Sequence, residues 1–189
     1  DVLVIGAGPA GVAAAYTTAH LGAKTVIVEA LGALGGIATS GMMSHWTGSC
    51  GSRLYHKILA DSAALRDGEL HGKILNEIDP ERLKYQFLKM LSDEGVKIYL
   101  YTLASDVIME ENRVKGVIVE NKEGRTAIFA HTVIDASGDG DIAAKAGVPY
   151  FMGRENDGKM QPATLMFKVG GVDMSRAVLL PSFESTYMT

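Results

Sequence analysis

The first eleven residues constrain the fold of this chain more than any other stretch. A short apolar run, Val2 to Ile5, leads directly into the pattern Gly6-Ala-Gly8-Pro-Ala-Gly11, and a segment of small residues follows. Strand, glycine turn and helix in this order form the context in which the G-x-G-x-x-G pattern predicts a dinucleotide-binding unit. The alternative is a glycine-rich turn that binds no ligand.

The three glycines have separate physical functions in such a unit. Gly6 permits the tight turn after the strand, Gly8 lets the backbone approach a pyrophosphate, and Gly11 lets the helix lie close to the strand. Pro9 falls in the first helical turn, where its missing N–H costs nothing. The free N–H groups there, together with the helix dipole, face the phosphates.

A second strand, from Thr25 to Val28, ends in Glu29, which lies eighteen residues after Gly11. An acidic residue about 20 residues after the glycines is suited to bind a ribose 2′-hydroxyl. The same carboxylate would repel the 2′-phosphate of NADP. Glu29 is therefore predicted to bind the ribose, and the alternative is an ordinary surface glutamate at a strand end.

The segment after Glu29 contains Gly35-Gly36-Ile-Ala-Thr39-Ser40 and is rich in glycine and hydroxyl groups. A plain NAD-binding fold would enter a crossover helix here. A long loop of small residues can instead wrap around a larger dinucleotide, and the alternative is a flexible surface loop.

His45 and Cys50 follow this loop. They are too few ligands for a metal site, which usually needs three or four. No metal is expected, and Cys50 has no CxxC partner that would make it a redox thiol.

The rest of the chain predicts alternating helices and strands. Asp79 is expected to cap a helix that starts at Pro80 and ends near Gly95. From 103 to 130 the apolar period changes to two, which predicts a three-stranded antiparallel meander. The other expected elements are a helix over 53–65, a strand over 96–100, a strand over 132–135, a short helix over 142–146 and a strand over 161–171.

These elements predict an α/β fold, a Rossmann-like parallel sheet with an inserted three-stranded antiparallel β-meander and the start of a second domain. The expected domains are a dinucleotide-binding domain over 1–150 and the beginning of a substrate or cap domain over 151–189, apparently truncated.

The strand over 132–135 leads into Ala136-Ser137-Gly138-Asp139-Gly-Asp141. Small residues at the carboxyl end of a strand allow close backbone approach in the crevice where such sheets bind ligands. An equally supported interpretation of Asp139 and Asp141 is that they cap the following helix.

The composition and charge of the chain limit the kinds of molecule that it is expected to bind and where it is expected to be located. The net charge is −4, and no basic cluster is longer than a pair, so nucleic acid is not an expected partner. A single cysteine fits a reducing compartment and a cytoplasmic location. No apolar run is long enough to span a membrane. The absence of an initial Met is compatible with a removed leader.

The glycine turn, Glu29, the LGGIATSG loop, the VIDASGDGD segment after the meander and a later MQPATLMF together resemble FAD-dependent oxidoreductases with the glutathione-reductase-like FAD-binding fold. The resemblance covers nearly the whole chain. It implies FAD as cofactor, although the family's later Gly-Asp segment near the ribitol has no counterpart. The residues it implies for FAD binding are Gly6, Gly8, Pro9, Ala10, Gly11, Glu29, Ala30, Gly35, Gly36, Ala38, Thr39, Ser40, Val107 (or its neighbour Asp106), Ala136, Ser137, Gly138 and Asp139.

The expected function is that of an FAD-dependent oxidoreductase that transfers two electrons through the flavin and acts on a small-molecule substrate. The catalytic residues, the electron acceptor and the oligomeric state are not defined by the sequence. His45 and Arg53 are candidates only because they follow the loop that approaches the ring. Two alternatives remain, an NAD-linked dehydrogenase and a flavoprotein subunit of an RNA-modifying or electron-transfer complex.

Overall fold

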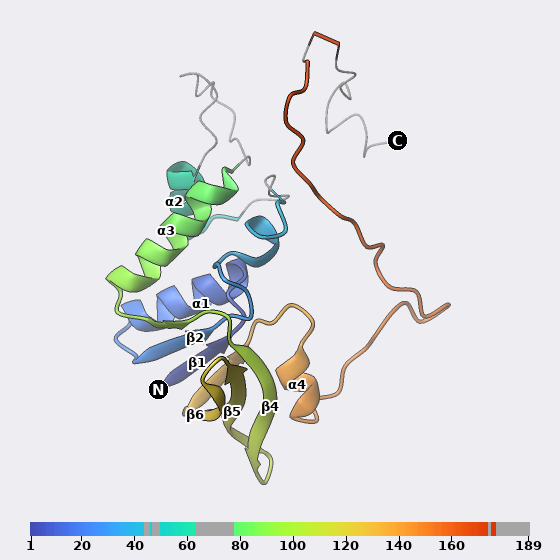
Figure 1. The fold of residues 1–189 in the computed structure, drawn as a ribbon. Coiled ribbons are helices and arrows are strands. Elements are labelled where there is room, and N and C mark those ends of the chain that lie inside the picture. The colour runs from blue at the N-terminus through green and yellow to red at the C-terminus, as the bar shows by residue number, and fades with distance from the viewer. Residues whose placement is uncertain (44–45, 47–49, 63–77, 174, 177–189) are drawn as a thin grey trace.

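The computed structural model describes residues 1–43, 46, 50–62, 78–173 and 175–176. Within these ranges the chain forms a four-stranded parallel sheet, in the order β3-β2-β1-β7, and a three-stranded antiparallel sheet, in the order β4-β5-β6 (Figure 1). The elements in chain order are β1 (Val2–Ile5), α1 (Pro9–His20), β2 (Thr25–Val28), η1 (Gly36–Ala38), α2 (Arg53–Ser62), α3 (Pro80–Asp93), β3 (Lys97–Tyr99), β4 (Leu103–Glu110), β5 (Arg113–Asn121), β6 (Gly124–Phe129), β7 (Thr132–Asp135) and α4 (Asp141–Lys145).

The parallel sheet reverses its strand order at β1. The chain first builds outward from β1 to β2 and β3, and it then returns to place β7 on the other side of β1. Val2 pairs with both Thr25 and Thr132, so β2, β1 and β7 are in register. In such sheets ligands bind beyond the carboxyl ends of the strands at the reversal point. That point lies between Ile5 and Asp135, beside the glycine turn.

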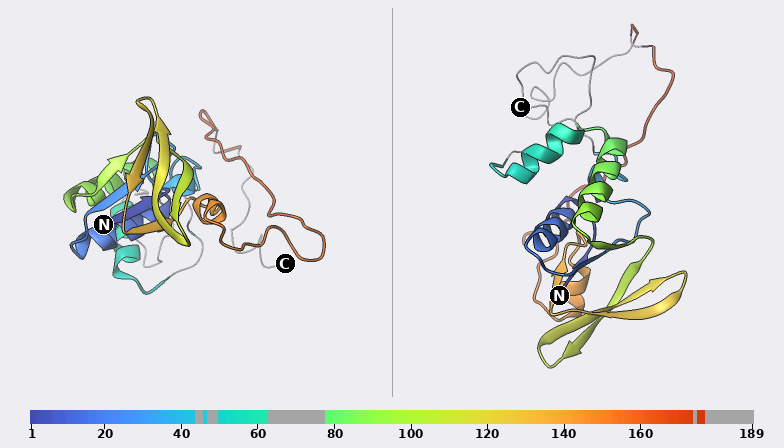
Figure 2. Two further views of the ribbon diagram at one scale, coloured as in Figure 1. Left: turned by 90° about the horizontal axis from the view of Figure 1, so that it is seen from below. Right: turned by 90° about the vertical axis from the view of Figure 1, so that its left-hand side faces the viewer.

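Alternate residues of each strand point to opposite faces of the parallel sheet. Both faces are covered by other elements. Val4 and Ile27 pack into a cluster with residues of α1, α2 and α3. Leu3 and Ile5 pack on the other face against β5 residues Val117 and Val119 and against Ile142 of α4. The result is three layers, with helices on one side and the antiparallel sheet and α4 on the other (Figure 2).

The sequence predicted this arrangement correctly in its main elements. The α/β class, the parallel sheet and the inserted antiparallel meander are all present. Asp79 caps α3 as expected, since its carboxylate accepts the N–H groups of Glu81 and Arg82 at 2.8 and 3.2 Å. The helix expected over 53–65 is described as far as Ser62, and its expected end falls outside the described residues.

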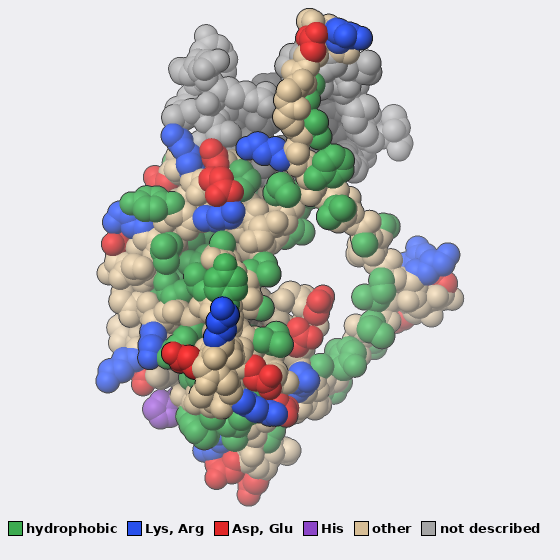
Figure 3. Space-filling model, viewed as in Figure 1, with side chains coloured by type: hydrophobic (Ala, Val, Ile, Leu, Met, Phe, Trp, Pro, Cys, Tyr) green, Lys and Arg blue, Asp and Glu red, His purple; other side chains and the backbone are tan. Residues whose placement is uncertain are grey.

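The prediction of a strand over 161–171 is wrong. These residues have no regular secondary structure and belong to an extended arm over 150–173 that leaves the domain after α4 (Figure 1). Hydrophobic side chains line this arm (Figure 3), and Leu165 and Phe167 are 85% and 73% exposed. A strand is stabilised by hydrogen bonds to a neighbour, and among the described residues no strand pairs with this segment. The second domain over 151–189 stays a prediction.

Phe87 provides a test of the helical layer. Its side chain on α3 is fully buried in the cluster against α1 and β1. Phe87→Ala is expected to lower the free energy of unfolding by about 3–5 kcal/mol, because it removes apolar contacts and leaves a cavity. Leu88→Ala, at the adjacent and 45% exposed position, is the control and should cost far less. Denaturant unfolding of the two variants makes the comparison, and equal losses would contradict the packing described here.

Candidate dinucleotide-binding site

Backbone packs against backbone at the glycine turn. Gly6 has φ of +87°, a left-handed conformation that favours glycine. A Cβ on Gly6 would also overlap the carbonyl of Ala136, and a Cβ on Gly11 would overlap the carbonyl of Gly6. Gly11 therefore lets α1 lie against β1, as the sequence predicted. Gly6 also lets the end of β7 approach the turn, which the sequence did not predict.

Gly8 differs from the other two glycines of the turn. It is the N-cap residue of α1, with φ −63° and ψ 178°, an ordinary extended conformation. A Cβ at this position would have no protein atom within 4 Å. No side chain caps α1, and Pro9 begins the helix. Gly8 is thus required neither by its conformation nor by internal packing, and it lies at a helix N-terminus, which favours an anion.

The loop after β2 folds back onto this turn. The Gly35 N–H donates to the Ala7 carbonyl at 2.6 Å, and a Cβ on Gly36 would lie 3.1 Å from the Gly8 Cα. Thr39 is buried, and its hydroxyl donates to the Leu34 carbonyl at 2.7 Å. The Thr39 proton is therefore used within the loop, whereas Ser40 is exposed.

Glu29 is 7% exposed and is not an ordinary surface glutamate. One carboxylate oxygen accepts the Ala7 N–H at 2.7 Å, and the other accepts the Leu31 N–H at 2.8 Å. The carboxylate thus ties the glycine turn to the loop after β2. Each oxygen has a second lone pair that can accept a hydroxyl group.

A cleft of about 120 Å³ opens beside Glu29 at the carboxyl edge of the parallel sheet. This volume is below the roughly 300–1,000 Å³ of sites that bury most of a drug-sized ligand, so the cleft accommodates only part of a dinucleotide. Glu29 and Asp141 make its wall acidic, which suits ribose hydroxyls and disfavours an additional phosphate. The lining residues are Ile5, Gly6, Val28, Glu29, Ala30, Thr102, Leu103, Ala104, Ser137, Asp141 and Ile142.

The structure contradicts the interpretation that Asp139 and Asp141 cap the helix that follows them. The N-cap residue of α4 is Gly140, with φ of +72°, and it makes no side-chain cap. Asp135 at the end of β7 satisfies the helix instead, because its carboxylate accepts the N–H groups of Ile142 and Ala143 at 2.9 and 2.8 Å. Its other oxygen accepts the Ser137 N–H at 3.0 Å.

The environment of Asp135 favours its ionised form. Burial alone raises the pKa of this carboxyl. The hydrogen bond from the Ser137 side chain and those from the Ala143, Ser137 and Ile142 N–H groups outweigh burial, and the net pKa lies below the ordinary value of 3.8. The ionised carboxylate of Asp135 accepts the N–H groups of Ser137, Ile142 and Ala143. It therefore holds in place the part of the cleft wall that Ser137, Asp141 and Ile142 form.

Val107, which the resemblance implies for FAD binding, does not line this cleft. Its side chain packs into the core cluster with Val117 rather than lining the cleft. The register of β4 against β5 shifts between Ala104 and Asp106, a β-bulge that alternation in the sequence does not reveal. Leu103 and Ala104, at the start of β4, line the cleft instead.

Ala136 packs behind Gly6, while Gly138 and Asp139 are exposed. Arg53 is exposed at the start of α2, and His45 lies outside the described residues. Cys50 is exposed and unpaired. Across the described ranges no three His, Cys, Asp or Glu residues cluster as metal ligands, and no helix there has the length and apolar character needed to cross a membrane.

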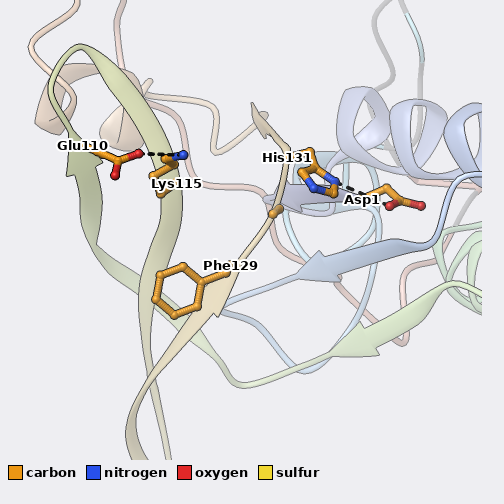
Figure 4. A pocket seen from close by; sticks show the side chains of 6 residues that line it. Asp1, Glu110, Lys115, Phe129 and His131 are labelled. Atoms are coloured by element: carbon orange, nitrogen blue, oxygen red, sulfur yellow. Dashed lines mark ion pairs between the residues drawn. The ribbon is translucent and has the colours of Figure 1, made fainter.

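A second hollow lies at the opposite edge of the parallel sheet (Figure 4). Ion pairs at its rim join Glu110 to Lys115 at 2.7 Å and Asp1 to His131 at 3.6 Å. Asp1 and His131 precede β1 and β7, so this hollow is at the amino ends of the strands. It therefore lies away from the edge where such sheets bind dinucleotides.

This chain is similar to known proteins in sequence and in fold. The family model described as FAD dependent oxidoreductase matches residues 1–187. The thiamine thiazole synthase of Metallosphaera sedula is 33% identical over 171 residues, covering 77% of this chain and 57% of that protein. The thiamine thiazole synthase of Saccharolobus solfataricus is 32% identical over 164 residues, covering 77% and 58%. The chain thus spans a little over half the length of these curated relatives.

Solved structures agree on the fold. THI4 of Thermovibrio ammonificans superposes with a TM-score of 0.54 at 20% identity, covering 77% of this chain and 60% of that one. A geranylgeranyl bacteriochlorophyll reductase-like protein from Thermoplasma acidophilum gives 0.56 at 21% identity, covering 78% and 41%. At these identities the likeness concerns the fold alone.

Asp135→Asn is expected to destabilise the protein by about 1–2 kcal/mol, the magnitude of a lost helix cap. Because folding lowers the pKa of Asp135, the wild-type advantage is complete above the ordinary value of 3.8 and is lost as pH falls through the lower folded value. Denaturant unfolding of both proteins between pH 7 and pH 3 measures the difference. Asp139→Asn is the control, and a larger loss for it would restore the cap to Asp139.

Proposed function

Because the chain belongs to the FAD dependent oxidoreductase family, we propose that it is the FAD-binding part of an enzyme that transfers two electrons between FAD and a small-molecule substrate. FAD is the cofactor of this family, and when bound it supplies the redox chemistry while the protein binds and orients it. We further propose a cytoplasmic enzyme without a nucleic-acid partner, on the basis of the single cysteine and the net charge of −4.

The observation that best supports the proposal is the bare side of Gly8. It lies at the uncapped N-terminus of α1, and the Gly36 backbone packs close to the same residue. Glycine here leaves room for a pyrophosphate against the N–H groups of the first turn. No internal contact of Gly8 would account for the missing side chain.

The rest of the proposed site follows from this anchor. Glu29, at the end of β2, is suited to accept the adenosine ribose hydroxyls inside the acidic cleft. The backbone of Ala30 and the 102–104 segment would flank the adenine. The loop from Gly35 to Ser40 starts in space beside Gly8. It would follow the cofactor from the pyrophosphate toward the flavin.

The loop also favours FAD over the NAD-linked alternative. In a simple βαβ unit the chain would enter a helix after Glu29, whereas here it returns to the glycine turn through the Gly35 to Ala7 hydrogen bond. That return would bring backbone to a second side of a bound pyrophosphate. A larger dinucleotide uses these additional contacts.

Gly8→Ala separates binding from folding. The Cβ meets no protein atom and φ is −63°, so the melting temperature is expected to stay close to that of wild type. The Cβ would occupy the path of the phosphates, so FAD affinity should fall about tenfold or more, the effect of roughly 1.4 kcal/mol. Thermal unfolding and calorimetric titration with FAD measure the two quantities.

Gly11→Ala is the matched control for Gly8→Ala. Its Cβ overlaps the Gly6 carbonyl, and overpacking of this kind costs about 1–3 kcal/mol of stability. The proposal predicts a loss of binding without a loss of stability at position 8 and a clear loss of stability at position 11. Unchanged FAD affinity in Gly8→Ala would exclude the glycine turn as the phosphate site.

Glu29→Ala is expected to weaken FAD binding about ten- to a hundredfold, because charge-assisted hydrogen bonds contribute about 1.5–3 kcal/mol each. Glu29→Gln retains an oxygen for one backbone N–H and should bind with intermediate affinity. Glu120→Gln, at an exposed position near the end of β5, is the control. Titrations with FAD, ADP and NAD are compared, and tighter binding of NAD than of FAD would contradict the flavoprotein assignment.

A further inference from the structure

Tyr101 joins the parallel sheet to the antiparallel sheet in an unusual conformation. It lies between β3 and β4 with φ of +50°, in the left-handed region that bulky side chains seldom occupy. Its side chain is not buried by the core, since the residue is 73% exposed. Glycine or asparagine would adopt this backbone more easily, so neither conformation nor core packing explains a tyrosine here.

The Tyr101 ring contacts the loop that follows Glu29. A Cβ added to Gly32 would overlap the ring and hydroxyl of Tyr101, so the ring lies directly on the Gly32 backbone. Gly32 is not among the glycines with positive φ, and its backbone therefore does not itself require glycine. The close contact of the Tyr101 ring is what the absence of a side chain at Gly32 permits.

Backbone hydrogen bonds connect the same two segments. The Tyr101 N–H donates to the Leu31 carbonyl at 3.1 Å, and the Thr102 N–H donates to the Glu29 carbonyl at 2.9 Å. The Leu31 N–H in turn donates to the Glu29 carboxylate at 2.8 Å. The ring therefore packs on the loop whose Leu31 N–H orients the carboxylate proposed to bind ribose.

The residues next to these contacts line the cleft. Ala30 precedes Leu31 on the loop, and Thr102 follows Tyr101 at the start of the meander, and both line the cleft beside Glu29. A shift of the 30–32 loop relative to the 101–103 segment would change the width of the cleft. The contact between Tyr101 and Gly32 joins these two segments, and neither residue itself lines the cleft.

We propose that Tyr101 is a positioning residue for the adenosine half of the dinucleotide, acting through Gly32 on the loop that orients Glu29. This inference rests on the proposed function, because it assigns a determinant of affinity to the same site. The ring acts by packing, so its hydroxyl is not required. This role accounts for an exposed aromatic ring on a left-handed backbone at position 101.

The first experiment separates affinity from stability. ADP, which contains the adenosine and pyrophosphate groups, is titrated by calorimetry into wild type, Tyr101→Asn and Tyr101→Phe. Tyr101→Asn keeps a residue suited to positive φ and should leave the melting temperature unchanged or higher, while ADP affinity falls about five- to tenfold. Tyr101→Phe should bind as wild type. Tyr85→Asn, at a 69% exposed position on α3, controls for loss of an exposed tyrosine.

The second experiment tests the contact with Gly32. Gly32→Ala should displace the ring and weaken ADP binding about as much as Tyr101→Asn, and the double variant should be no weaker than either single variant. Additive losses would overturn the proposed contact, and wild-type affinity in Tyr101→Asn would overturn the positioning assignment alone. Failure of the wild-type protein to bind ADP would overturn the proposed function and this inference with it.

Discussion

The close approach of backbone segments at the carboxyl end of β1 is the constraint on which the rest of the structure depends. Gly6 lies against Ala136 at the end of β7, and Gly11 lies against the Gly6 carbonyl. These contacts bring the helix start and the end of β7 to the point where the sheet order reverses. Any larger residue at Gly6 or Gly11 would separate elements that the site needs together.

Two electrostatic environments follow from this geometry, and they suit different parts of one ligand. The N-terminus of α1 has no side-chain cap, so its N–H groups and dipole favour negative charge. The cleft beside it has the opposite character, because Glu29 and Asp141 line it. A dinucleotide with phosphates in the middle and ribose hydroxyls at one end fits both, whereas a phosphate on that ribose would face the acids.

The sequence predicted the features that depend on local chemistry. The glycine turn, the Asp79 cap and the meander each arise from neighbours in the chain, and each is present. The cap of α4 was missed because Asp135 reaches N–H groups seven and eight residues away. A signal was available, since Asp135 also accepts the N–H two residues on, a common property of aspartate at turns. The bulge beside Ala104, by contrast, depends on how β4 meets β5.

The arm over 150–173 shows why an alternating pattern alone does not specify a strand. Leu165, Phe167 and Val169 alternate as a half-buried strand would, yet all three are more than 60% exposed. Period-two alternation reports that one side of an extended segment is apolar, while the strand itself needs a neighbour for its N–H and C=O groups. The residues of β1 have such neighbours on both sides, and the arm has none among the described strands. The order of residues in the arm therefore explains why one side of the segment is apolar. The absence of a neighbouring strand among the described residues explains why the segment is not a strand.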